Sequence, residues 1–193
     1  MNKSALLKVL GLVSLFPGVA IAHIGVVETT GFIHGFSHPI GGADHLIVML
    51  AVGLWAAQIG RRALWAVPGT FVMVMVLGGV LGFSGVSVPF IEVGILLSVL
   101  VLGVLIAGAF KLPVILSALI VGFFALFHGY AHGTEMPVAI GAASYSIGFT
   151  LATTMLHTIG IAVGILSRGI HLEKANRFAG GILVLYGIYL AAS

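Results

Sequence analysis

The feature that most restricts the fold of this chain is a succession of long apolar runs, almost free of charge, between residue 41 and the C-terminus. Hydrophobic residues make up 60% of the chain and charged residues only 7%, whereas soluble domains carry about 25% charged residues. The runs approach the ~20 residues that a helix needs to cross a bilayer. They lack the two-residue alternation of membrane β-strands. The sequence therefore predicts an all-α, polytopic membrane protein.

Six transmembrane helices are expected, and the basic residues orient them. We place the spans at residues 41–59, 63–83, 89–110, 112–131, 142–166 and 178–191. All basic residues beyond the first span fall in alternate connections: Arg61, Arg62, Lys111, Arg168, Lys174 and Arg177. Positively charged loops stay in the cytoplasm. The other connections and both ends of the mature chain should therefore face the periplasm, which predicts a multi-pass protein of a bacterial inner membrane.

The first 22 residues have the pattern of a secretory signal peptide. A basic start with Lys3 and Lys8 precedes a short apolar run, and the segment ends on small residues at positions 20 and 22. Cleavage after Ala22 would make His23 the new N-terminus, whose amine and imidazole can chelate one metal ion together. The alternative is an uncleaved first transmembrane helix. Residues 23–193 are expected to form a single six-helix transport domain.

The ionisable side chains concentrate at the outer side of this predicted bundle. Apart from the basic loop residues, only His171 and Glu173 fall on the cytoplasmic side. Ionisable groups at membrane depth are costly unless paired or hydrated, so they mark functional sites. The candidate metal ligands are His23, His34, His38, Asp44, His45, Glu92, His128, His132, Glu135 and His157.

The densest group surrounds the start of the first span. In a continuous helix His34, His38 and His45 would fall within about 20° of one another, although the two glycines after residue 40 argue against strict continuity. Asp44 can neutralise a cation or orient an imidazole. The alternative is a polar start of the helix with Asp44 as its N-terminal cap.

The fourth and fifth spans carry the other histidines. His128 and His132 lie one helical turn apart and can grip one metal ion, and Glu135 can join the same face. The alternative is a pair of interfacial histidines in an aromatic belt. His157 ends a polar stripe near the bilayer midplane, where the alternative is a hydrogen bond to a neighbouring carbonyl. Glu92, near the start of the third span, is either a ligand or a partner in a buried network.

These donors favour a transition metal as cargo. The chain contains no cysteine, and nitrogen-rich, oxygen-assisted ligation suits divalent Ni, Co, Zn or Cu better than Mg or Ca. A Walker A motif is absent from the sequence, and the membrane potential can itself drive a divalent cation inward. We therefore expect secondary uptake, with no enzyme activity, no catalytic cofactor and no nucleic-acid partner. The alternatives are a membrane metallohydrolase and, from the Gly-x-Ser-Gly segment around Ser84, a rhomboid-like serine protease.

Two signatures resemble those of the HupE/UreJ family of nickel permeases. The first is His38-Pro-x-x-Gly-x-Asp44-His45, and the second is Phe127-His128-Gly-x-Ala-His132-Gly-x-Glu135. The resemblance implies uptake of nickel, in some members cobalt, for hydrogenase or urease maturation, with metal handling by the histidines and acids of both signatures. Another nickel/cobalt family has four residues between its histidine and its Asp-His pair, whereas this chain has five.

The expected route begins with capture at the outer face and ends near the midplane. His23, His34 and His38 should capture the ion. Transfer should follow to Asp44, His45, His128, His132 and Glu92, and then past His157. The inner half offers few polar groups, and neither the choice between nickel and cobalt nor the oligomeric state follows from the sequence.

Overall fold

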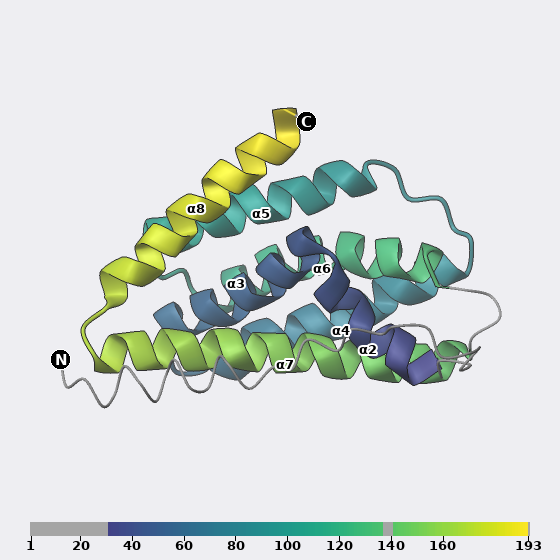
Figure 1. Ribbon diagram of the computed structural model, residues 1–193, viewed down its shortest axis with the longest axis horizontal. Helices are drawn as coiled ribbons and strands as arrows, with labels where there is room; N and C mark the ends of the chain where they lie inside the picture. The colour runs from purple at the N-terminus through teal and green to yellow at the C-terminus, as the bar shows by residue number, and fades with distance from the viewer. Residues whose placement is uncertain (1–30, 137–140, 193) are drawn as a thin grey trace, which may run out of the picture.

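A computed structural model describes residues 31–136 and 141–192 of the chain (Figure 1). These residues form seven α-helices and contain no β-strand. The helices are α2 (Gly31–Gly41), α3 (Ala43–Ile59), α4 (Ala63–Phe83), α5 (Ile91–Ala107), α6 (Val114–Thr134), α7 (Ala142–Gly169) and α8 (Glu173–Ala192). The predicted all-α fold is confirmed. The predicted signal peptide, residues 1–22, and His23 lie outside the described residues.

Each predicted span coincides with a helix, and the bounds of α4 match the prediction at both ends. The additional helix α2 occupies part of what was expected to be a polar stretch before the first span. It is bent by 82° from α3. Gly42 causes the break, because its extended backbone, with φ −99° and ψ 120°, cannot continue the helix. The histidines on either side of this break therefore do not share one straight helix face.

The helices make this a multi-pass membrane protein. Four of them, α4, α6, α7 and α8, are long and apolar enough to cross a bilayer, and the bent pair α2 and α3 passes the same test as one unit. The remaining helix, α5, is apolar but has only 17 residues. Large apolar side chains such as Trp65, Ile115 and Phe178 are exposed on the outside of the bundle, as expected for a surface that faces lipid.

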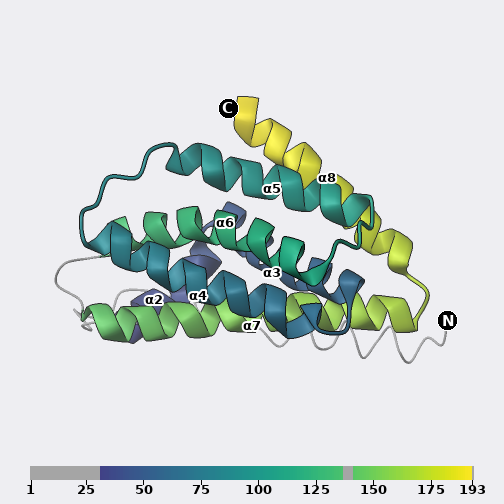
Figure 2. The same ribbon diagram turned by 180° about the vertical axis from the view of Figure 1, so that it is seen from behind.

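The helices form two layers of unequal size (Figures 1 and 2). Helices α5 and α8 lie side by side and form the smaller layer on one side of the molecule. The other helices form the larger layer, in which α3, α4 and α6 lie between the smaller layer and the long α7. Helix α2 packs across the N-terminal half of α7, and α4 packs mainly against α6.

Glycines bring the backbones of neighbouring helices into direct contact. A Cβ atom on Gly78 of α4 would lie 2.4 Å from the Leu126 carbonyl oxygen of α6. A Cβ atom on Gly160 of α7 would lie 2.2 Å from the Leu50 carbonyl oxygen of α3. Only glycine permits so close an approach. The helices that carry the histidines are therefore held close together.

Candidate metal site

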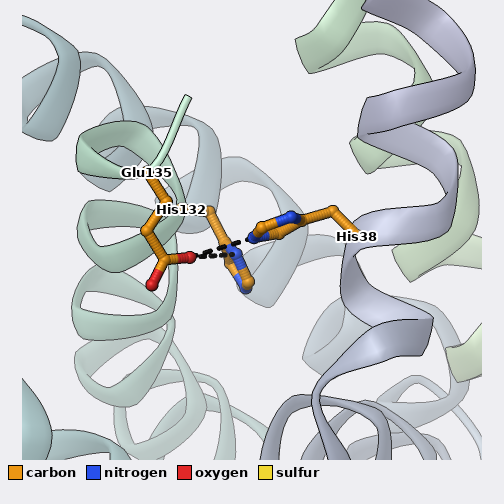
Figure 3. A group of neighbouring side chains, drawn as sticks. All are labelled: His38, His132 and Glu135. Carbon is orange, nitrogen blue, oxygen red and sulfur yellow. Dashed lines mark hydrogen bonds and ion pairs between the residues drawn. The ribbon is translucent and has the colours of Figure 1, made fainter. Parts of the chain in front are cut away.

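The outermost part of the site joins α2 to the end of α6. His38, His132 and Glu135 each offer one ligand atom, and these atoms lie within 4.8 Å of one another. Figure 3 shows His38 pointing from α2 toward the two α6 side chains. The distance from His38 Nε2 to Glu135 Oε2 is 2.9 Å, and that from His132 Nδ1 to the same oxygen is 3.7 Å. We call these three residues the outer group.

The outer group is open on one side and closed on the other. The Glu135 side chain is 56% exposed and that of His38 is 34% exposed, but His132 is only 5% exposed. Helix α2 reaches this position by packing tightly on α7, because a Cβ atom on Gly35 would lie 2.0 Å from the Tyr145 carbonyl oxygen. An ion can thus meet Glu135 and His38 first and His132 last.

His45 extends the site inward from the outer group. Its ring centre lies 4.2 Å from that of His132 and 4.9 Å from that of His128. Asp44 Oδ1 lies 2.9 Å from His45 Nδ1. The N-cap of α3 is Gly42, without a side-chain cap bond, so the Asp44 carboxylate contacts the imidazole instead of capping the helix.

His128 lies deeper still and is fully buried. Its Nε2 is 2.9 Å from the hydroxyl oxygen of Ser98 on α5. The Ser98 hydroxyl also lies 2.6 Å from the Ile95 carbonyl oxygen, which can only accept a hydrogen bond. The single hydroxyl proton goes to that carbonyl, so His128 Nε2 donates to Ser98. Ser98 was not among the predicted site residues, and a lone serine within an apolar span was the signal for it.

His157 is the innermost histidine. Its Nδ1 donates to the Met49 carbonyl oxygen of α3 at 2.7 Å, which is the contact foreseen as the alternative to a ligand role. The ring of Phe71 separates it from the other histidines, with centres 5.0 Å from His157 and 5.8 Å from His128. The other ring nitrogen of His157, Nε2, takes no part in the hydrogen bond to Met49.

The three deeper histidines share one arrangement. One ring nitrogen of each donates a hydrogen bond to a neighbour: the Asp44 carboxylate, the Ser98 hydroxyl or the Met49 carbonyl. The opposite nitrogen, which carries the lone pair in the neutral ring, is buried and has no hydrogen-bond partner among the described residues. These atoms are His45 Nε2, His128 Nδ1 and His157 Nε2.

Both nitrogens of His132 are likewise buried without a hydrogen-bond partner in the described part of the chain. Leaving buried polar atoms unsatisfied costs about 1–3 kcal/mol each. We call the row of histidines from His38 through His132, His45 and His128 to His157 the file. Its buried lone pairs carry this free-energy cost unless a ligand binds them. A transition-metal cation fits these donors, because neutral imidazole nitrogen is one of its commonest ligands.

Two other predicted ligands lie apart from this file. His34 is exposed on α2, and no hydrogen bond or ring contact of its side chain joins it to the histidines within residues 31–136 and 141–192. Glu92 is exposed in the first turn of α5. Their roles as ligands stay predictions.

Ser84, the serine of the alternative protease motif, ends α4 and donates to the Val80 carbonyl at 2.6 Å. In the described part of the chain no histidine contacts it, so the arrangement lacks the base that activates a serine nucleophile.

Comparison with known proteins decides the family. The family model described as HupE / UreJ protein matches residues 11–190. The chain belongs to the HupE/UreJ family. A curated relative, Protein HupE of Rhizobium leguminosarum bv. viciae, is 43% identical over 174 residues, which cover 90% of this chain and 91% of the relative. No solved structure gives a significant match.

The resemblance seen in the two signatures is thereby confirmed. In this HupE/UreJ chain the two signatures lie far apart in sequence, one in α2 and α3 and the other in α6. The fold brings them together, because His38 and His45 both contact His132.

Proposed function

We propose that this protein carries a divalent transition metal, nickel or cobalt, from the periplasm to the cytoplasm without ATP. The observation that carries the proposal is the file of histidines that runs from the exposed Glu135 and the partly exposed His38 to the buried His157, along which ring nitrogens have no hydrogen-bond partner among the residues that the structure describes. The HupE/UreJ family is associated with nickel and cobalt transport, and the two signatures belong to this file. The link to hydrogenase or urease maturation rests on the family alone.

The file suits stepwise ligand exchange. The outer group binds the ion first through two imidazoles and one carboxylate, which partly replace its hydration shell. Successive ring centres from His38 through His132 and His45 to His128 lie 4.2–4.9 Å apart. An ion between two such rings can keep one nitrogen while it gains the next. His157 is the last ligand, and His23, His34 and Glu92 are proposed to assist at the outer side.

Six spans and an inward direction complete the proposal. Arg61, Arg62 and Lys111 lie in the connections of α3 to α4 and of α5 to α6. Arg168, Lys174 and Arg177 lie in the last turn of α7 and the first two turns of α8, beside the connection of these two helices. If helices α3 to α8 all cross, these connections share the cytoplasmic side, and the outer group lies at the opposite, periplasmic side. A membrane potential of about 100 mV then contributes roughly 4.6 kcal/mol to inward movement of a divalent cation. The chain therefore needs no ATPase domain.

Metal accumulation in whole cells tests the function. Cells that express the full chain should accumulate nickel or cobalt above cells with an empty vector. Asp44→Ala should abolish the gain, because it removes the carboxylate that holds His45. Ser84→Ala is the matched control and should accumulate metal normally, because Ser84 bonds only to a helix carbonyl.

The opposite results separate the alternatives. If correctly inserted protein gives no accumulation of either metal, the transport proposal fails, and hydrolysis of membrane substrates becomes the activity to assay. If Ser84→Ala alone abolishes function, the serine-protease alternative replaces it.

A further inference from the structure

A cavity lined mostly by polar residues lies at the end of the bundle away from the outer group, where α3, α5 and α7 end and α8 begins. In Figure 1 this end is where the chain passes from α7 to α8. The cavity measures about 210 Å³. Its polar side chains are Gln58, Lys111, Arg168, Glu173, Asn176 and Arg177. Three of them are cations and one is a carboxylate, so the cavity favours an anion.

The two arginines are held in place without losing their charge. The Arg168 guanidinium donates to the Ala57 carbonyl at the end of α3, and Arg177 Nε donates to the Ala107 carbonyl at 2.8 Å. Each guanidinium has five N–H donors, so several remain for a ligand. Every ion pair among the described residues lies at the histidine end. None of the described acids therefore forms an ion pair with these cations.

Lys111 is the third cation, and no hydrogen bond or ion pair within the described residues engages its ammonium group. It precedes α6 and is exposed. The first turn of α8 also lines the cavity, and the dipole of this helix favours negative charge at its N-terminus. Glu173 supplies the only carboxylate of the cavity wall. The balance of charge around the cavity is positive.

Exposed apolar side chains are close neighbours in sequence of the charged cavity residues. Leu166 and Ile170 each lie two residues from Arg168, Phe178 follows Arg177, and Phe110 precedes Lys111; all four are exposed. A free anion has no use for this apolar surface. A phospholipid uses both parts, because its headgroup carries a phosphate and its acyl chains cover apolar residues.

We propose that this cavity binds the phosphate group of an anionic phospholipid. Lys111, Arg168 and Arg177 contact the phosphate, and the acyl chains lie along the exposed apolar residues of α7 and α8. The cavity wall includes residues of α8 and of the connection after α5 as well as of α3 and α7. The bound lipid therefore joins the two layers of the molecule at the side that carries the basic loops. The inference does not depend on which ion the histidines handle.

Thermal unfolding of the purified full chain in neutral detergent tests the inference. Phosphatidylglycerol should raise the unfolding temperature, whereas phosphatidylcholine at the same concentration should not. The phosphatidylglycerol concentration that gives half of the maximal rise in unfolding temperature should increase about fivefold in Lys111→Gln. The reason is that the loss of one basic residue near an anionic lipid weakens binding by about this factor. Lys174→Gln is the matched control, because Lys174 is exposed at the same end but does not line the cavity.

Each of several results would overturn the inference. Equal effects of the two lipids, or equal losses in Lys111→Gln and Lys174→Gln, would show that no specific site exists. Stabilisation by inorganic phosphate as strong as that by phosphatidylglycerol would show a free anion as the ligand. Arg177→Gln is a second variant. The change in its unfolding temperature on addition of phosphatidylglycerol, and not the unfolding temperature itself, is compared with that of the wild-type protein.

Discussion

Ser98→Ala is the sharpest test of how the file of histidines works. The substitution removes the oxygen that accepts the proton of His128 Nε2 at 2.9 Å. The imidazole then loses the contact that fixes the orientation of its ring and leaves the Nδ1 lone pair available. Removal of a group that orients a metal-binding histidine costs about 10–100-fold in metal affinity. We expect the half-saturating metal concentration for uptake to rise by that factor.

The assay is the initial rate of nickel or cobalt uptake as a function of metal concentration, at matched amounts of protein in the membrane. Ser117→Ala is the control, because Ser117 is equally buried but its hydroxyl bonds only to main-chain carbonyls. It should change the half-saturating concentration less than twofold. Ser98→Thr, which keeps the hydroxyl, should recover much of the loss.

The reasoning about Ser98 is refuted if folded Ser98→Ala transports with unchanged affinity. It is also refuted if Ser98→Ala and Ser117→Ala lose affinity equally, because the effect would then come from the loss of any buried hydroxyl.

Three further predictions use the same uptake and unfolding assays. Asp44→Asn should slow uptake at least tenfold, because it removes the negative charge beside His45; near-normal rates would show that the charge is dispensable. Uptake should fall as the pH drops below about 6, because a protonated imidazole cannot bind a metal, and an equal rate at pH 5 and pH 7 would show that no imidazole that becomes protonated in this range takes part in uptake. Gly129→Ala should lower the unfolding temperature, because the new Cβ would lie 1.9 Å from the Met75 carbonyl oxygen. Gly181→Ala, where a Cβ meets nothing within 4 Å, should leave that temperature unchanged.

The sequence was sufficient to place the helices that follow residue 42, because apolar runs bounded by charges, glycines and prolines mark them directly. It did not reveal α2, whose histidines, serine and glycines resemble a polar connection. That helix owes its position to contact with α7, where Gly35 packs against the Tyr145 carbonyl. Such a contact between distant segments leaves no local pattern.

The candidate site was predictable to a similar degree. The spacing of His128 and His132 on one helix, and the density of polar residues around Asp44, marked them as candidates. The spacing could not show that Asp44 contacts His45 and does not cap the helix, since either role suits an acid in the first turn. Nor could it single out Ser98, whose partner lies 30 residues away.

The glycine contacts divide the histidines between two rigid bodies. Helices α4 and α6 touch backbone to backbone through Gly78 and Gly129, and they carry His128 and His132. Helices α3 and α7 touch in the same way through Gly160, and they carry His45 and His157. A small rotation of one body against the other would change the distances between ligands from different bodies and would leave every backbone contact within each body intact. The boundary between the two helix pairs is thus where a relative movement would change the coordination of a bound ion.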